Sequence, residues 1–480
     1  MREKLAEIIE YLKHKKVDYA DIRFVETKTE SITVKNNRLE ELARNDNRGI
    51  GIRILHNGCW GFAACSELTK SSLKKTAEKA LRIARASAVT NKEMVRLAPV
   101  EIFRTSYVSP CRVDPFAVPL DEKIDMLIAV NRVLTKNPKI KMAEAGLDFF
   151  HTEKLFCSTE GAIIEQTIIE SGGGYDVTAV DKGEVQRRSY PNSHRGDYAC
   201  AGYEFVDEMK FMENAERVAD EALALLEAPP CPSGKFDIII TGSQLALQVH
   251  ESCGHPVELD RVLGTEISLA GGSFLTTDKL GKYRYGSPIV NIVADSTIPG
   301  ALGSFGYDDE GVAASRTDII KEGIFAGYLS SRETTSTINI PPTGVMRADG
   351  WNRIPLIRMT NINLEPGNWE YDDLLADTED GIILDSNKSW SIDDKRLNFQ
   401  FGVEAAWRVK KGRITTMYKN PVYSGITPEF WNSCDAICNR DHWRIWGLPS
   451  CGKGEPMQTA HVAHGTAPAR FRKVEVGVGR

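Results

Sequence analysis

The chain has 480 residues and a formal net charge of −6, and its basic residues are scattered among acidic ones, which argues against a nucleic-acid-binding protein. This length exceeds one typical hydrophobic core, while no segment reaches the roughly 20 consecutive apolar residues of a membrane span. Ten cysteines without the short spacings of a disulfide framework predict reduced thiols and, with no signal-peptide core at the N-terminus, a cytoplasmic protein.

Residues 1–228 are predicted to form an N-terminal α+β domain of two similar halves. In the first half, a helical spacing of apolar residues is followed by alternating apolar and polar residues and then by a second helical pattern. These patterns predict a helix, an antiparallel meander and a closing helix at residues 3–16, 19–65 and 70–86. Turns are expected within the meander where asparagines cluster, at residues 36–37, 45–47 and 57–58.

The second half repeats this order of elements. A helix, a set of strands and a long helix are predicted at residues 120–134, 141–185 and 206–226. Three consecutive glycines at residues 172–174 are expected to interrupt the strands. The likeness between the halves lies in element order rather than in residue identity, and it favours an internal duplication.

The clearest linker is the Pro- and Gly-rich stretch over residues 228–234, which predicts a domain boundary there. Residues 235–480 are predicted to form a mostly β catalytic domain, a curled sheet or barrel, that carries one prominent helix near residues 243–263. A buried strand over residues 236–240 precedes this helix. Further strands are predicted at residues 289–294, 323–329, 381–384, 398–410 and 412–417.

Two histidines and a glutamate in the predicted helix form the strongest chemical signal of the chain. The segment reads His250-Glu251-Ser252-Cys253-Gly254-His255. Imidazole nitrogens are good zinc ligands, and a glutamate beside the first histidine can take a proton from zinc-bound water, whose pKa falls to about 7. In the familiar HExxH helix, the two histidines are four residues apart and share one face.

Here the histidines are five residues apart, so in a regular helix their directions would diverge by about 140°. A π-helical turn of about 4.4 residues would reduce this angle to roughly 50°. Gly254 relaxes the backbone, and Pro256 lacks an amide donor and crowds the Ser252 carbonyl. We therefore predict a distorted helix through His250 and His255.

Catalytic zinc usually has three protein ligands and keeps a fourth position for water. The best third ligand is Cys451, which we expect in a flexible loop where a nearby cation in Gly452-Lys453-Gly454 favours the thiolate. Glu258 and Asp260 are competing ligands on the motif segment. Glu258 could instead orient a ligand histidine, or it could form a structural salt bridge or face solvent. His461 and His464 follow the loop, and we expect them to be surface or packing residues.

The motif and several later blocks resemble the TldD/PmbA family of metalloproteases, and the TldD branch in particular. In that branch an acidic residue follows the second histidine by three positions, as Glu258 does here. Further matching blocks are Asp308-Asp309-Glu310-Gly311, Pro342-Thr343-Gly344 with Arg347, Arg358-Met359-Thr360-Asn361 and Cys451-Gly452-Lys453. The PmbA branch lacks the metal motif, so the resemblance implies a catalytic chain.

The resemblance implies that His250, His255 and Cys451 bind Zn²⁺ and that Glu251 is the general base. It also implies a metalloprotease for unfolded or short polypeptides, bound as an extra strand, and a homodimer or a heterodimer with a PmbA-like chain. We expect water to attack the peptide carbonyl while Glu251 moves a proton from the water to the leaving amine. A thiolate ligand makes the metal less electrophilic, and the sequence identifies no oxyanion donor.

Two other functions stay open. The chain could be a non-catalytic subunit or regulator of a TldD/PmbA-type dimer with a structural metal, in which case a fourth protein ligand such as His461 is expected. It could also hydrolyse amides other than peptides. A second metal site through Cys434 and Cys438, with His442, competes with the more ordinary interpretation of buried or loop thiols.

Three further residues or segments have both a structural and a functional interpretation. Residues 308–311 lack the ligand spacing of a calcium loop and are expected to form a turn near the active site. Arg347 and Arg358 would either grip a bound peptide or form internal ion pairs.

Overall fold

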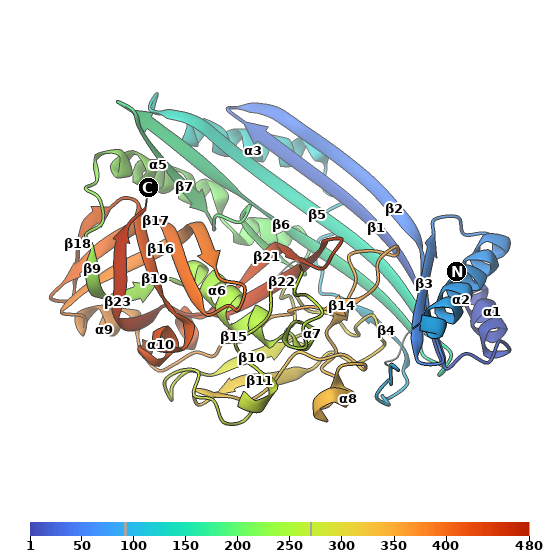
Figure 1. The fold of residues 1–480 in the computed structure, drawn as a ribbon. Coiled ribbons are helices and arrows are strands. Elements are labelled where there is room, and N and C mark those ends of the chain that lie inside the picture. Colours follow the sequence, from blue (N-terminus) through green and yellow to red (C-terminus); the bar gives the residue numbers. More distant parts are fainter. Residues whose placement is uncertain (91–93, 269–270, 480) are drawn as a thin grey trace.

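The structure is a computed structural model that describes residues 1–90, 94–268 and 271–479. A long antiparallel sheet lies over a C-terminal part that contains a closed barrel of five strands (Figure 1). The predicted α+β fold class, with a barrel-like C-terminal part, is confirmed. The division into separate domains at residues 1–228 and 235–480 stays a prediction.

The large sheet is built from strands of very unequal length. Its members are β1 Tyr19–Lys35, β2 Arg38–His56, β3 Cys59–Cys65, β4 Arg104–Val108, β5 Ile140–Ser158, β6 Ile163–Asp181, β7 Glu184–Tyr190 and β8 Asp197–Ala199. The main path runs β3-β2-β1-β5-β6-β4, and β7 and β8 also pair with β6. The pairs are antiparallel except β4 with β6.

Helices cover one face of this sheet in two groups. They are α1 Arg2–Lys13, α2 Lys70–Thr90, α3 Leu120–Leu134, α4 Glu204–Glu208 and α5 Phe211–Glu227. The first two pack on β1–β3 at one end, and α3 and α5 pack on β5 and β6 further along (Figure 1). Each group forms its own apolar core, and the order helix, consecutive strands, helix recurs in both halves, as predicted.

Two predicted interruptions of the sheet are wrong. Residues 45–47 lie inside β2, where they pair with residues 27–29 of β1. The three glycines continue β6, where they pair with β5. Glycine is needed at residue 172 because a Cβ there would lie only 2.1 Å from the Tyr198 ring. Glycine therefore serves close packing between strands here instead of a turn.

Two predicted turns in the N-terminal half are confirmed, and one predicted helix is divided. The turns at residues 36–37 and 57–58 are confirmed, with positive φ at their asparagines. The helix predicted over residues 206–226 is divided into α4 and α5, because Lys210 adopts a left-handed conformation with a φ of 51°.

The C-terminal barrel closes because β16 pairs with both β9 and β17. Its strands are β9 Gly234–Ile240, β16 Asp380–Ile392, β17 Asn398–Lys410, β19 Pro421–Ile426 and β23 Ala469–Val478, with β18 Arg413–Tyr418 and β20 Cys434–Ile437 at its margins. The strands predicted at residues 236–240, 398–410 and 412–417 are confirmed. The strand predicted at residues 381–384 is longer than expected.

Short elements connect the barrel to the large sheet. The strands are β10 Ile292–Asp295, β11 Arg316–Lys321, β12 Ile324–Phe325, β13 Met346–Arg347, β14 Leu356–Ile357, β15 Ile362–Leu364, β21 Arg444–Lys453 and β22 Gln458–Thr466; the helices are α6 Gly242–Val249, α7 Leu259–Val262, α8 Thr335–Ile338, α9 Tyr371–Ala376 and α10 Thr427–Asn432. The strand predicted over residues 323–329 is wrong beyond Phe325, because Leu329 instead donates a backbone hydrogen bond to Val257 of the motif segment at 2.9 Å.

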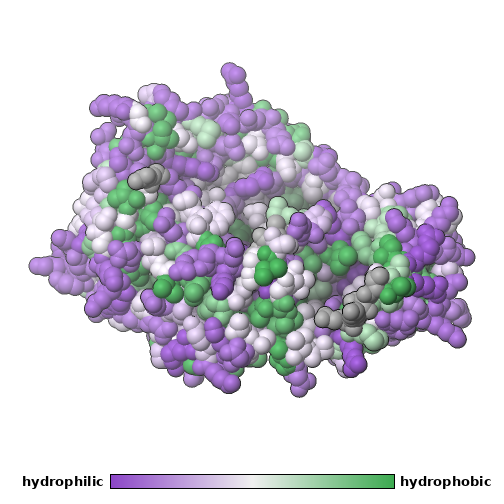
Figure 2. Space-filling model, in the orientation of Figure 1, coloured by the Kyte–Doolittle hydropathy of each residue, from purple (hydrophilic) through white to green (hydrophobic). Residues whose placement is uncertain are grey.

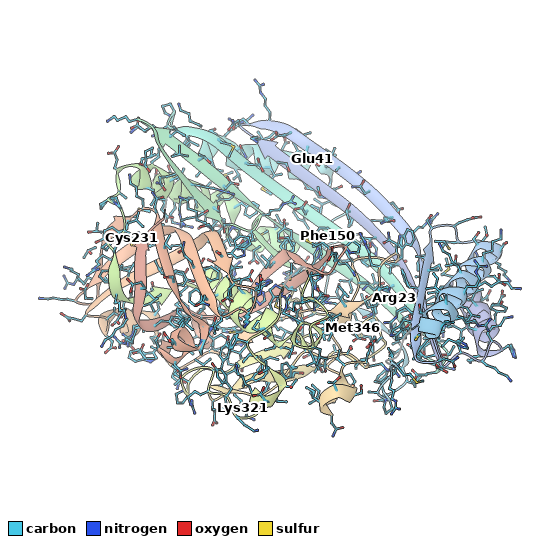
Figure 3. The ribbon with its side chains drawn as sticks, viewed as in Figure 1. Arg23, Glu41, Phe150, Cys231, Lys321 and Met346 are labelled. Carbon is cyan, nitrogen blue, oxygen red and sulfur yellow. The ribbon has the colours of Figure 1, made fainter. Side chains whose placement is uncertain are left out.

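The C-terminal part contacts the large sheet through the turn at residues 308–311. Asp309 lies 3.3 Å from both Arg23 on β1 and Lys154 on β5, and Glu310 lies 3.4 Å from Arg53 on β2. Figure 3 labels Arg23 and Phe150 on the long strands and Met346 in the C-terminal part. The turn is confirmed as a turn; the carboxylates of Asp309 and Glu310 bind side-chain cations of the protein, and that of Asp308 accepts backbone amides.

Hydrophilic residues cover most of the face that Figure 2 shows, with small groups of hydrophobic residues between them. Over the described parts of the chain, the structure has no helix with both the length and the apolar character that crossing a membrane requires.

Candidate metal centre

Three buried side chains converge between the helix α6 and the β21–β22 ribbon. One ligand atom from each of His250, His255 and Cys451 lies within 4.8 Å of the other two. The His255 Nε2 and the Cys451 Sγ are 3.8 Å apart. A tetrahedral zinc ion would hold an imidazole nitrogen and a thiolate about 3.5 Å apart, so the spacing of His255 and Cys451 is near that of two zinc ligands.

The backbone brings the two histidines together by the predicted distortion. After α6 the chain forms a π-helical turn over His250–Gly254, which ends where the His255 amide donates to the His250 carbonyl. A 3₁₀ turn over His255–Val257 follows, and α7 begins only at Leu259. The prediction of a distorted helix is confirmed, and the expected helix over residues 243–263 is in fact four short segments.

Side chains compensate the backbone where Pro256 interrupts the helix. The Tyr285 hydroxyl donates to the Ser252 carbonyl, which the proline deprives of its amide partner. The Ser252 hydroxyl donates to the Gln248 carbonyl at 2.5 Å. Gly254 is needed for a different reason, because a Cβ there would lie 2.0 Å from the Met359 sulfur.

Cys451 lies in a strand, and the prediction of a flexible loop is wrong. It pairs with Ala460 just after an irregularity in β21, and its side chain is buried. The Arg358 guanidinium donates to the carbonyl of Cys451. Burial would raise the pKa of the thiol, but Arg358 and then His255 bring this pKa below its ordinary value.

The expected cation, Lys453, has another role. Its ammonium group donates to Asp260 at 2.7 Å and lies 3.5 Å from Glu258. Asp260 is therefore held in an ion pair with Lys453 and is not one of the three converging donors. Arg358, instead of Lys453, supplies the positive charge next to the Cys451 sulfur.

Both imidazoles are oriented through their Nδ1 atoms. The His255 Nδ1 is 3.1 Å from the Glu258 carboxylate, which also forms ion pairs with Arg261 at 3.1 Å and Lys453 at 3.5 Å, so Glu258 fills both of the roles that the sequence left open. The His250 Nδ1 is 2.8 Å from the His464 Nε2, whose own Nδ1 is 3.0 Å from the Ile362 carbonyl. Because a carbonyl only accepts, His464 must donate to it and accept from His250, which leaves the His250 Nε2 lone pair free for a metal.

Burial also keeps the ligand imidazoles neutral. It lowers the pKa of His250 to about 4 and lowers the pKa of His255, so both rings are unprotonated at neutral pH. Burial raises the pKa of the Glu258 carboxyl, but Lys453 and His255 outweigh it and hold this pKa well below its usual range. The Glu258 carboxylate is therefore charged, while both imidazoles are neutral and able to bind a metal.

Glu251 follows the first histidine and forms an ion pair that the sequence did not reveal. Its carboxylate contacts the Arg396 guanidinium, which comes from the turn between β16 and β17. Both side chains line a cavity of about 420 Å³. The same cavity is lined by the three metal-binding candidates and by His194 and Trp390.

The remaining predicted residues lie outside this donor group. His461 pairs with Glu170 of the large sheet at 2.9 Å, so it does not complete a four-ligand shell. Arg347 and Arg358 bind backbone carbonyls of His461 and Gln458, rather than a carboxylate partner.

The second metal site is not supported. Among the residues that the structure describes, the group at the motif is the one cluster of three or more donor residues with suitable spacing. Cys434 and Cys438 are buried free thiols, and His442 contacts Glu370 at 3.1 Å.

Comparisons with known proteins agree with this geometry. Residues 20–84, 113–226 and 233–477 match the models of PmbA/TldA metallopeptidase domain 1, central domain and C-terminal domain. A metalloprotease of Methanocaldococcus jannaschii is 31% identical over 420 residues, which covers 88% of this chain and 89% of the relative. A zinc metalloprotease TldD homolog of Saccharolobus solfataricus is 24% identical over 471 residues and covers 96% of both chains.

A solved structure from Thermotoga maritima, described as a candidate modulator of a DNA gyrase, has the same fold. It is 20% identical, with a TM-score of 0.79 over 99% of this chain and 100% of its own. At this identity the likeness supports the fold alone.

Proposed function

The chain belongs to the PmbA/TldA metallopeptidase family, and on this basis we propose that it is a zinc-dependent protease that cleaves peptide bonds in unfolded or short polypeptides. The observation that carries this proposal is the convergence of His250, His255 and Cys451 beside Glu251 in one cavity. Two imidazoles and a thiolate suit zinc, and a relative is named a zinc metalloprotease.

The residues divide the work of hydrolysis between them. Zinc, when bound, supplies Lewis-acid polarisation and lowers the pKa of water. Glu251 takes a proton from the attacking water as the new C–O bond forms at the peptide carbonyl carbon. It then delivers this proton to the amine nitrogen as the C–N bond breaks, which leaves a carboxyl group and a free amine. His464 and Glu258 keep the two imidazoles in place throughout.

The dimensions of the cavity support small or unfolded substrates. Its volume is about 420 Å³, and all three metal-binding candidates are buried. A folded protein could not bring a peptide bond to such a position, whereas an extended segment bound through backbone hydrogen bonds could.

We also propose a dimeric protein of the cytoplasm, either a homodimer or a pair with a PmbA-like chain. Residues 38–48 of β2 extend beyond β3 and are mostly exposed, so they offer strand edge to a partner. All ten cysteines are free thiols, which suits a reducing compartment.

Replacement of the proposed base tests the mechanism directly. Glu251→Gln is expected to retain zinc and to lose peptide cleavage, because an amide cannot accept the proton, and Glu379→Gln on the exposed surface is the control. Zinc content and chromatographic cleavage of an unstructured polypeptide are measured together. Full activity of Glu251→Gln would refute the assignment of the base.

The same assay separates the alternatives. A zinc-loaded wild type that cleaves no polypeptide would favour a non-catalytic subunit or a hydrolase for other amides. Against the first of these, no fourth donor residue joins the group within the described residues.

A further inference from the structure

The proposed base does not face the cavity alone. Arg396 is 14% exposed and its Nη1 contacts the Glu251 carboxylate, which is itself 8% exposed. Both line the cavity of the metal-binding candidates. The Arg396 guanidinium is thus held next to Glu251, in the cavity where the proposed function requires the substrate carbonyl to react.

The turn that carries Arg396 is held on several sides. Arg396 has a φ of 64°, a left-handed conformation that is costly for a residue with a side chain. Its amide donates to the Asp393 carbonyl at 2.8 Å, and its carbonyl accepts from the Thr427 hydroxyl at 2.9 Å. The Asp393 carboxylate also accepts from the Leu397 and Asn398 amides, at 2.7 and 3.1 Å. These contacts fix the backbone of the turn, and Glu251 holds the guanidinium, in advance of any ligand.

Arg396 retains hydrogen-bonding capacity in this position. A guanidinium has five N–H donors, and only its Nη1 contacts Glu251. The Nε–H is buried and has no acceptor among the described residues. Arg396 therefore keeps N–H donors beyond the one that contacts Glu251, and these can bind an acceptor that enters the cavity.

The chemistry at this position needs positive charge. A thiolate ligand cancels part of the charge of a divalent metal, yet water attack places negative charge on the carbonyl oxygen. Among the described residues that line the cavity, Arg396 is the one arginine or lysine. His194, Ser391 and Ser450 offer hydrogen bonds there, but they carry no fixed positive charge.

We infer that Arg396 is a catalytic residue that binds the oxygen of the scissile carbonyl and stabilises the negative charge that this oxygen acquires. Glu251 holds the Arg396 guanidinium in position. This inference rests on the proposed function. As the water oxygen bonds to the carbonyl carbon, the C=O π electrons move to the oxygen next to Arg396. They return as the C–N bond breaks, and the amine leaves with the proton that Glu251 took from the water.

Substitutions separate this role from substrate binding. For zinc-loaded Arg396→Met, acting on a peptide with an amidated C-terminus, we expect kcat to fall by about 100-fold or more. KM is expected to stay within about threefold of the wild-type value, because the contact forms mainly in the transition state. Arg396→Lys should recover part of kcat, since it keeps the charge and the Glu251 contact but lacks the planar fork.

Lys395→Met is the matched control, because it removes an exposed cation from the same turn that does not line the cavity. It should leave kcat and KM unchanged. Zinc content and the melting temperature of each variant show that folding and metal loading persist. A rise in KM at unchanged kcat, or a loss confined to peptides with a free C-terminal carboxylate, would overturn the inference.

A tetrahedral analogue gives a readout without turnover. A phosphinic peptide carries a charged oxygen where the reacting carbonyl oxygen would be, and calorimetry measures its binding to the zinc-loaded protein. We expect Arg396→Met to raise its Kd by about 100-fold, in step with kcat/KM. Equal Kd values for the wild type and Arg396→Met would refute the role of Arg396 even if the protein is a protease. If the wild type cleaves no peptide, the proposed function fails, and an Arg396-dependent Kd would still support the contact.

Discussion

The imidazole of His464 supports His250 from the side away from the cavity, and this contact is expected to set the metal affinity. In His464→Ala, the His250 Nδ1–H loses its buried acceptor at 2.8 Å. Loss of such a partner typically lowers metal affinity by about 10–100-fold. His461→Ala is the control, because that imidazole contacts Glu170 instead. Competition with a chromophoric chelator measures both variants, and equal losses would contradict the assignment.

His194 predicts a pH dependence of stability. Burial, with a contribution from His250, lowers its pKa from 6.5 to about 4. Between these pH values the unfolded chain binds more protons than the folded protein, so the free energy of unfolding falls as the pH falls from 6.5 to about 4. This residue contributes at most about 1.4 kcal/mol per pH unit. Urea unfolding of the zinc-free protein should show a flatter pH dependence in His194→Gln, and parallel curves would count against it.

Among single residues, the sequence predicted those of the candidate site whose chemistry follows from their residue type and their spacing in the motif. His250, His255 and Cys451 were predicted as metal ligands and Glu251 as the general base, because few residue types bind zinc or move its water, and the structure brings all four to one cavity. Arg396 and His464 were missed as partners, since each lies more than a hundred residues from the side chain it contacts. Neither has a distinctive sequence signal: one is an arginine in a polar turn, and the other is a histidine in an ordinary strand.

The π-helical turn depends on a side chain outside it. Tyr285→Phe removes the hydroxyl that donates to the Ser252 carbonyl, and an orphaned buried carbonyl costs about 1–3 kcal/mol. The turn that spaces the histidines is expected to loosen, which lowers both stability and zinc affinity. Tyr175→Phe removes a buried hydroxyl bonded to the Phe211 carbonyl at 3.1 Å in the large sheet. This control should lose stability but bind zinc normally, and a normal zinc affinity in Tyr285→Phe would contradict the prediction.

Elements with a local signal were predicted well. The helix over Leu120–Leu134 follows from the spacing of its apolar residues, and the distortion at the motif follows from the histidine spacing and Pro256. Elements that depend on distant partners were not. Asparagine and glycine usually mark turns, but residues 45–47 and 172–174 continue strands because neighbouring long strands pair with them. Cys451 follows Pro449, a residue typical of loops, yet pairing with β22 makes the segment a strand.

In the whole molecule, the cavity depends on contacts between the large sheet and the C-terminal part. His194 comes from the segment between β7 and β8 of the sheet, while the metal-binding candidates come from the π-helical turn, the 3₁₀ turn that follows it and β21. The β21–β22 ribbon contacts both parts, because β21 packs on β8 and His461 packs against Phe150 at 4.8 Å between ring centroids. A change that loosens the sheet from the ribbon should therefore also disturb the cavity.

Asp309 tests this dependence. It is buried, and its carboxylate lies 3.3 Å from both Arg23 and Lys154 of the large sheet. Asp309→Asn leaves the buried Arg23 and the partly buried Lys154 without this counter-charge, and breaking a buried ion pair costs about 3–5 kcal/mol. Asp318→Asn, which affects an exposed ion pair with Lys321, should change stability by only about 0.5 kcal/mol. Urea unfolding measures both, and chelator competition shows whether zinc affinity falls with Asp309→Asn. A cost equal to that of the control would mean that the two parts are held together by other contacts, and the cavity would then be independent of this turn.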